Sequence, residues 1–241
     1  MNLIKEFNIQ IDDVITITGG GGKTSLMFAI GKELSEMGMN HVLTTTAKIC
    51  VSDVPKNQRI ISNDIKEVLK QITENPEKEW VIGKEMVEGQ KISGFSDEEL
   101  EFLHNSLDSF VIVNEGDGSK RKPYKFYNEY EPMIPRLTTK IIHVIGAEVL
   151  YQKINDEFFH RSELFGNPEA VFSELVFKKE LENFKKNKLD INMSENITQI
   201  LLINKADGNG FKKAEIMGEI GKSIFDSCFI GSLKEGWIQK C

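Results

Sequence analysis

A run of four glycines followed by lysine and threonine is the first feature with a chemical use. Residues 15–25 read ITITGGGGKTS, so an apolar stretch leads directly into the glycines. Glycine is unfavourable inside a helix or strand, so four in succession need a backbone reason. The candidates are a phosphate-binding loop, a dinucleotide-binding turn and a flexible turn. The residues that a phosphate-binding loop would use are Gly19, Gly20, Gly21, Gly22, Lys23, Thr24 and Ser25.

The spacing of these residues favours the phosphate-binding loop. A dinucleotide turn requires G-x-G-x-x-G, and counted from Gly19 its last position is Thr24. The next apolar stretch ends in threonines rather than in the acidic residue that would hold a ribose. Residues 22–24 match the end of G-x-x-x-x-G-K-[ST], although Ile17 occupies the first glycine position. The loop resembles the variant K-G-G-x-G-K-[ST], with Thr18 in place of the first lysine.

An acidic partner for magnesium follows a second apolar stretch. Phosphate loops act with Mg²⁺, which the hydroxyl of Thr24 and an acidic residue from a neighbouring strand would hold. The segment SFVIVNEGDGS offers Glu115 and Asp117, followed by Gly118, whose N–H would approach a γ-phosphate. We assign the metal to Thr24 and Glu115. Lys23, Glu115 and Asp117 are then the expected catalytic residues, but spacing alone does not separate the roles of the two acids, and an ordinary turn is the alternative.

A third motif indicates the base of the nucleotide. The apolar stretch TQILLIN leads into Asn204, Lys205 and Asp207, which form the N-K-x-D sequence of GTP-binding proteins. An aspartate accepts hydrogen bonds from two guanine donors that adenine cannot match. Ser232, in a loop after the last apolar stretch, would close over the base. Both segments have a surface turn as their alternative.

Composition narrows the class of protein. The 241 residues carry a formal net charge of −7, which gives no basic field for nucleic acid. No apolar run approaches the ~20 residues of a membrane span, and the N-terminus lacks a signal-peptide core, so we expect a cytoplasmic protein. The three cysteines are far apart and predict neither a disulfide framework nor a metal pair.

Alternating apolar stretches and helical patterns position these motifs. They predict an α/β fold similar to P-loop NTPases, with a mostly parallel sheet and helices on both faces, in one nucleotide-binding domain over 1–241. The capping pattern of Ser96 and Glu99 and the N-cap type of Asp64 mark two helix starts. We expect strands at 14–18, 41–46, 59–62, 79–83, 109–115, 140–146, 198–204 and 227–231, and helices at 23–37, 64–75, 96–108, 168–189 and 210–224.

The sequence resembles a known family most specifically around the acidic motif. The stretches TITGGGGKTS, LTTTAKI and NEGDGSKRKPYKFYNEYEPMIP are similar to the YqeC-type accessory proteins of selenium-dependent molybdenum hydroxylases. That family's pattern is approximately E-A-D-G-S-K/R-x-x-P-x-K followed by H-E-P-x-I-P. Here Gly116 replaces the alanine, and Tyr130 stands where the histidine is expected. The resemblance implies a P-loop protein that acts in maturation of such a hydroxylase, with the hydroxylase or its cofactor-maturation proteins as partners.

Together these features predict a protein that binds GTP and Mg²⁺ and hydrolyses GTP slowly, because no glutamine is placed to orient water. One alternative is a small-molecule kinase or nucleotidyltransferase acting on a molybdenum or pterin cofactor. Another is a scaffold that senses nucleotide without chemistry. The sequence leaves open the oligomeric state, a homodimer included, and the roles of Cys50, of His160 and of the basic residues in 120–125.

Overall fold

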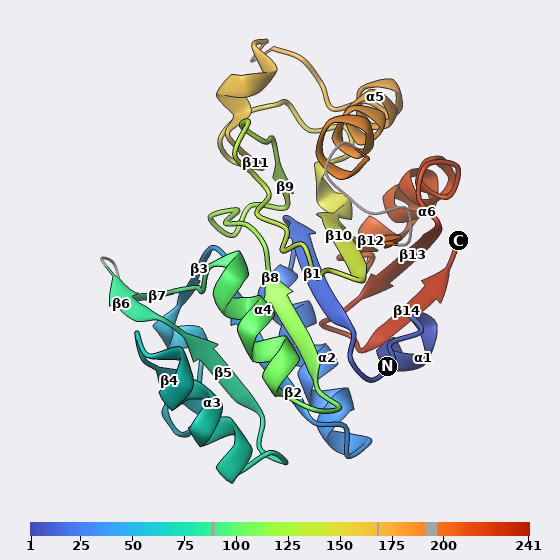
Figure 1. Cartoon of the computed structure of the whole chain (residues 1–241). Coiled ribbons are helices and arrows are strands. Elements are labelled where there is room, and N and C mark those ends of the chain that lie inside the picture. Colours follow the sequence, from blue (N-terminus) through green and yellow to red (C-terminus); the bar gives the residue numbers. More distant parts are fainter. Residues whose placement is uncertain (88–89, 168, 191–196) are drawn as a thin grey trace.

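The computed structural model describes residues 1–87, 90–167, 169–190 and 197–241. Within them one large sheet runs through the molecule (Figure 1). Its strands are β1 Val14–Gly19, β2 His41–Thr45, β4 Arg59–Ile61, β5 Trp80–Gly83, β8 Val111–Glu115, β10 Lys140–Gly146, β12 Thr198–Asn204, β13 Ser227–Ser232 and β14 Trp237–Lys240.

The order of these strands confirms a mostly parallel sheet. Among the described residues the nine strands follow the order β14-β13-β12-β10-β1-β8-β2-β5-β4. All neighbouring pairs are parallel except β13 and β14, which are antiparallel. In a parallel sheet the carboxyl ends of the strands meet at one edge. Strand β1 lies between β8 and β10, and β12 follows β10. Strands β1, β8 and β12 therefore bring the glycine loop, the acidic motif and residue 204 to the same edge.

Helices cover both faces, as the alternation of elements predicted. The helices are α1 Leu3–Glu6, α2 Lys23–Glu36, α3 Ile65–Glu74, α4 Asp97–Ser106, α5 Glu174–Phe184 and α6 Gly210–Gly221. On one face, α1 and α2 pack on a core that includes Ile15, Val113 and Val144. On the other face, α3 and α4 cover one end of the sheet, while α5 and α6 cover the opposite end.

The predicted capping residues begin their helices. The Asp64 side chain accepts a hydrogen bond from the Lys66 amide, and Ser96 and Glu99 form a reciprocal capping box. The prediction of a helix over 168–189 is wrong at its N-terminal end. Its first residue lies outside the described residues, but residues 169–173 are not helical, and α5 starts at Glu174 behind the N-cap Ser173. Residues 185–189 then continue as a turn of π-helix.

Several short elements carry no strong signal in the sequence. Three strands, β3 Lys48–Cys50, β6 Glu85–Val87 and β7 Lys91–Ser93, form a small antiparallel sheet beside the carboxyl edge of the main one. Two more, β9 Tyr124–Lys125 and β11 Phe159–His160, pair in parallel. Each strand has two or three residues, which is too short to show an apolar alternation. Residues of β3, β7 and β11 line the predicted site.

Candidate functional site

The glycine loop joins β1 to α2 and leaves the first amides of the helix free. Among the described residues, no protein acceptor binds the backbone N–H of Gly22, Lys23, Thr24 or Ser25. The preceding three amides already have acceptors. Gly19 donates to Asp117, and the next two amides donate to the carbonyls of Val144 and Lys122. A helix N-terminus with free amides is a site for an anion.

Close contacts explain why the loop consists of glycine. A Cβ on Gly20 would lie 2.6 Å from the carbonyl oxygen of Lys122, and one on Gly21 would lie 2.3 Å from the Gly146 amide nitrogen. Gly21 also has a φ of +74°, a conformation that side chains disfavour. The run of glycines therefore lets the loop pass against two neighbouring segments of backbone.

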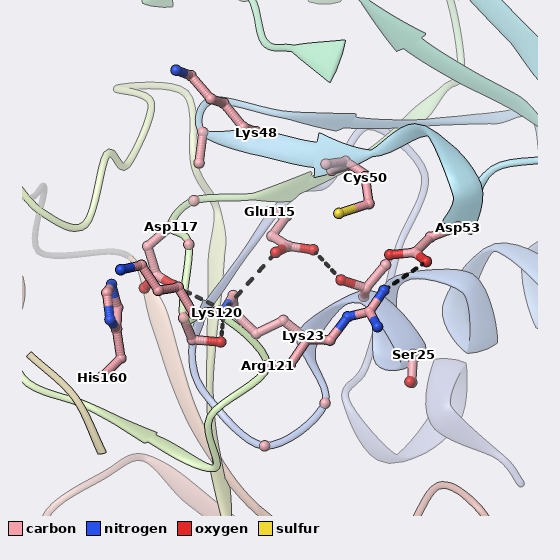
Figure 2. A pocket seen from close by; sticks show the side chains of 18 of the residues that line it. Lys23, Ser25, Lys48, Cys50, Asp53, Glu115, Asp117, Lys120, Arg121 and His160 are labelled. Carbon is pink, nitrogen blue, oxygen red and sulfur yellow. Dashed lines mark hydrogen bonds and ion pairs between the residues drawn. The ribbon is translucent and has the colours of Figure 1, made fainter. Parts of the chain in front are cut away.

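Lys23 is buried at the start of α2 and faces the acidic motif. Its Nζ lies 3.0 Å from Asp117 Oδ1 and 3.9 Å from Glu115 Oε1. It also donates to the Gly19 carbonyl at 2.7 Å and to Ser119 Oγ at 3.1 Å. Figure 2 shows Lys23 facing Glu115 and Asp117. The structure therefore brings the predicted lysine and both predicted acids together. In this structure, the two carboxylates lie within ion-pair distance of the lysine charge.

Asp117 is a buried carboxylate with several donors around it. Besides Lys23, its Oδ2 accepts from the Gly19 amide at 2.9 Å and from the Tyr127 hydroxyl at 3.0 Å. Burial alone would raise the pKa of Asp117, but the charges of Lys23 and Lys125 outweigh it and hold the pKa below the ordinary value. Asp117 is therefore an ionised group that orients the loop and its lysine.

Glu115 has a different environment at the end of β8. Its Oε2 accepts a hydrogen bond from Thr24 Oγ1 at 2.7 Å, which joins the acid to the first turn of α2. Burial raises the pKa of Glu115, and the nearby Lys23 offsets this only in part. Of the two acids, Glu115 is thus the one that pairs with the hydroxyl predicted to hold magnesium.

A cavity of about 900 Å³ opens in front of these residues. Residues 21–25 and 115–121 form one side of it, and the small sheet of β3 and β7 contributes the opposite side. This volume lies at the upper end of the range that ligand pockets span. Ser25 and Gly118, which the sequence predicts to contact the nucleotide, line the cavity, and so do Cys50 and His160, whose roles the sequence left open.

Asn204 joins the phosphate loop to the last loop of the sheet. Its Nδ2 donates to the Gly21 carbonyl at 2.7 Å, and its Oδ1 accepts from the Leu233 amide at 3.0 Å. A Cβ on Gly22 would lie 2.5 Å from that Nδ2 atom, so glycine is also needed here for the side chain to fit. Two motifs separated by more than 180 residues thus share one side chain.

The remaining residues of the predicted base motif lie together beyond Asn204. Ser232 Oγ donates to Asp207 Oδ1 at 3.1 Å, which links the two residues expected to contact guanine. Lys205 forms an ion pair with Glu148. Lys205 also lines the cavity, whereas Asn204, Asp207 and Ser232 do not. The cavity therefore reaches from the glycine loop to the base motif at Lys205 and does not include the other three residues.

Two residues support Asp117: Lys125, whose role the sequence left open, and Tyr127, which sequence reasoning missed. Lys125 Nζ is fully buried, donates to the Gly118 carbonyl at 2.7 Å and pairs with Glu131 at 2.9 Å. Glu131 in turn pairs with Arg161 at 3.0 Å. The segment between the acid motif and β11 thus forms a chain of alternating charges. Its sequence signal was the dense basic run, which predicted a solvated loop equally well.

Two histidines in strands, His41 and His143, are buried packing residues. His143 is buried in β10, where its ring stacks on Phe184 with centroids 4.0 Å apart. Burial lowers the pKa of His143 to about 3, so its ring is neutral. His41 is buried at the start of β2, and its Nδ1 donates a hydrogen bond to the Met39 carbonyl at 2.9 Å. Neither residue lines the cavity.

Comparison with known proteins places the chain in a family. A family model described as "YqeC protein" matches residues 15–163, which is more than half of the chain. The chain belongs to the YqeC family. The protein named "Uncharacterized protein YqeC" from Escherichia coli (strain K12) is 28% identical to it over 154 residues. The matched stretch covers 64% of this chain and 59% of that relative.

The YqeC family match covers only part of the candidate site. Residues 15–163 include the phosphate loop, both acids and the charge chain from Lys125 to Arg161. The base motif at 204–207 lies outside the matched range. The resemblance seen in the sequence is thus confirmed at the level of the family.

Proposed function

We propose that this protein binds a nucleoside triphosphate, GTP, at the loop of residues 19–25. The observation that carries the proposal is the cluster at the start of α2. Four free amides, the buried Lys23 ammonium and the Thr24–Glu115 pair converge on one point of the cavity. Free amides at a helix N-terminus together with a lysine are the groups that hold β- and γ-phosphates.

Binding of the triphosphate is, on this proposal, an exchange of partners by Lys23. The ammonium leaves Asp117 for the phosphate oxygens. Asp117 keeps the Gly19 amide, the Tyr127 hydroxyl and the nearby positive charge of Lys125. The carboxylate therefore stays ionised and paired after the lysine moves, and it continues to hold the loop at Gly19.

The donors at this point fit magnesium. Mg²⁺ is usually held by one or two protein oxygens together with phosphates and water. Thr24 Oγ1 and Glu115 Oε2 are two such oxygens, 2.7 Å apart and beside the free amides. In the described part of the chain, no group of three or more His, Cys, Asp or Glu side chains forms a metal cage. Bound Mg²⁺ would neutralise charge on the β- and γ-phosphates.

We further propose that the base is guanine and that hydrolysis is slow. The Asp207 carboxylate and its partner Ser232 support the first point, since both lie at the loop that Asn204 ties to Gly21. The lining of the cavity supports the second, because none of its described residues is a glutamine that could orient water. The protein would act in the cytoplasm. In the described residues no helix has the length and apolar character to cross a membrane.

The pathway is proposed from family membership alone. A YqeC-type protein would use GTP while a selenium-dependent molybdenum hydroxylase is matured, with that enzyme or its maturation proteins as the client.

An experiment on the purified protein tests the proposed nucleotide binding first. Calorimetric titration with Mg²⁺ and GTPγS should give binding, and ATPγS should bind at least ~10²-fold more weakly. Absence of binding by both nucleotides would overturn the proposal.

One observation favours a kinase or nucleotidyltransferase as the second candidate. The cavity continues past the phosphate loop and is lined there by residues of β3, β7 and β11 that a simple GTPase does not need. Faster phosphate transfer to an added small molecule than to water would favour this candidate. A scaffold without chemistry would bind GTPγS and release no phosphate from GTP, even with its client present.

A further inference from the structure

The cavity contains a region that the triphosphate and base do not account for. It lies at the small sheet of β3 and β7, whereas the base motif contributes Lys205 to the lining and Asp207 and Ser232 do not line the cavity. In Figure 2, Cys50 and Lys48 lie across the cavity from Lys23. His160 and Lys120 lie together on another side. This region is therefore bounded by the small sheet on one side and by the segment after the acidic motif on the other.

Unpaired positive charge surrounds this region. Lys48, Lys91 and Lys120 line the cavity, and none of them forms an ion pair with an acidic side chain in the described residues. Two other lining cations are neutralised, because Arg121 pairs with Asp53 at 3.3 Å and Lys205 pairs with Glu148. The acidic side chains that line the cavity are each within ion-pair distance of another cation: Glu115 and Asp117 of Lys23, Asp53 of Arg121, and Glu131 of Lys125. The three lysines therefore give the described lining an excess of positive charge, in a protein of net charge −7. Charge of one sign in a cleft attracts ligands of the opposite sign.

The thiol of Cys50 lies on the same side of the cavity as Lys48 and Lys91. Cys50 is the direct register partner of Lys91 in the antiparallel pair of β3 and β7. Side chains that are directly opposite in such a pair lie on the same face of the sheet, and their Cβ atoms are about 4.5–5.5 Å apart. The sulfur of Cys50 points into the cavity toward Glu115 (Figure 2), and the side chain is partly exposed. Its reactivity therefore reports on the occupancy of this region.

We propose that the region between Lys48, Cys50, Lys91, Lys120 and His160 binds a second substrate that carries a compact oxyanion group. This inference rests on the proposed function, because the triphosphate is taken to occupy the phosphate loop next to it. Ammonium groups on two sides match a phosphate-type oxyanion. Burial and the charges of Lys125, Arg161 and Lys120 lower the pKa of His160, which marks the same wall as electropositive. A free inorganic anion and a phosphorylated small molecule share this chemistry.

Alkylation of the cysteines measures binding at this region directly. Iodoacetamide labelling is followed at Cys50 and at the exposed Cys241 by peptide mass spectrometry, with increasing inorganic phosphate. The phosphate loop is filled with Mg²⁺ and GMPPNP, or disabled by Lys23→Ala. Labelling of Cys50 should slow about tenfold at phosphate ten times above its dissociation constant, by simple occupancy. Cys241 in the same molecule is the control and should keep its rate.

Variants of Lys48 and Lys91 test whether these lysines bind the anion. The double change Lys48→Ala with Lys91→Ala should weaken phosphate protection roughly tenfold, as expected when two partly exposed charge contacts are lost. Lys66→Ala, an exposed lysine on α3, is the matched control and should leave protection unchanged. Glycerol 2-phosphate replaces inorganic phosphate in a parallel series, and the tighter ligand identifies the kind of oxyanion.

The outcomes separate this inference from the proposed function. Absence of protection at Cys50 in both loop states, equal protection of Cys241, or unchanged protection in the double variant would each overturn the inference. Failure of GMPPNP to bind would overturn the nucleotide proposal alone, because the Lys23→Ala series needs no nucleotide.

Discussion

At the scale of single residues, Lys23 is the group on which the phosphate site depends. It is buried, and carboxylates hold its charge in this structure. Lys23→Ala should reduce the binding free energy of Mg²⁺–GTPγS by about 2–4 kcal/mol, the cost of losing a desolvated charge contact. Isothermal calorimetry measures this. Lys32→Ala on the exposed side of the same helix is the control and should bind normally.

The two acids should respond differently to neutralisation. Glu115→Gln should abolish the Mg²⁺ dependence of nucleotide binding and any turnover, because it removes the charge opposite Thr24. Asp117→Asn should mainly lower the unfolding midpoint, since a buried ionised group with donors from the loop is lost. Magnesium titrations and thermal melts of both variants test the assignment. The reverse pattern would give the metal to Asp117.

The raised pKa of Glu115 also predicts a pH dependence. A carboxyl group whose folded-state pKa lies above its ordinary 4.5 is harder to ionise in the folded protein. Stability without nucleotide is therefore lost as the pH rises from about 4.5 through the folded-state pKa. Glu115→Gln removes this loss, so the stability of the variant relative to the unmodified protein should increase over that window. Urea unfolding at a series of pH values measures the difference, and a flat difference would contradict the prediction.

On the proposed function, the choice of base depends on the Asp207 carboxylate. Asp207→Asn should lose GTP and gain xanthosine triphosphate, because an amide can donate to the extra carbonyl of xanthine and accept from its N1–H. Its partner Ser232 supports the loop from the other side. Competition between labelled GTP and unlabelled nucleotides measures the switch. An unmodified protein that binds ATP and GTP equally would mean that residues 204–207 are only a turn.

Most of the candidate residues could be found from the sequence because they combine rare types at fixed spacing. Four glycines before Lys23, or an asparagine and an aspartate after an apolar strand, are uncommon enough to stand out. Tyr127 and Lys125 could not be found in this way. A tyrosine or lysine in a basic segment has no distinctive pattern, and only the tertiary fold shows that both are buried around Asp117.

At the scale of elements, the phosphate loop depends on close backbone approaches. Gly20→Ala should reduce the free energy of unfolding by on the order of 1–3 kcal/mol, because its Cβ would meet the backbone of residues 122–124. Gly118→Ala is a matched control in the same cavity, since a Cβ there meets nothing within 4 Å. Chemical denaturation compares the two. An equal loss in both variants would contradict this account of the loop.

The long elements of the fold could be predicted, and the short ones could not. Strands β1, β10 and β12 are mostly apolar segments, and Asp64 and Ser96 are N-cap residues that mark the starts of their helices. The small sheet of β3, β6 and β7 consists of three-residue strands whose pairing depends on contacts distant in sequence. For the same reason, no sequence pattern indicates that Lys91 lies opposite Cys50.

At the scale of the whole molecule, bound nucleotide should stabilise the fold. A ligand that binds only the folded state at 100 times its dissociation constant adds about 2.7 kcal/mol to the free energy of unfolding. Mg²⁺–GTPγS should therefore raise the midpoint of thermal unfolding, and ATPγS at the same concentration should not. Scanning fluorimetry measures both, with Lys23→Ala as the control that shows no shift. A shift of equal size in that variant would place the nucleotide elsewhere.

The strand order has a consequence for protein synthesis. Strand β1 and the glycine loop leave the ribosome early, but the neighbours of β1 are strands β8 and β10, and the side chain that ties down Gly21 belongs to Asn204. Domains generally fold as units once their parts have been made. A nascent chain that ends before residue 204 thus carries the phosphate loop without its final support. We expect such a chain to be unable to hold a triphosphate, so the proposed site would form only after residue 204 has been translated.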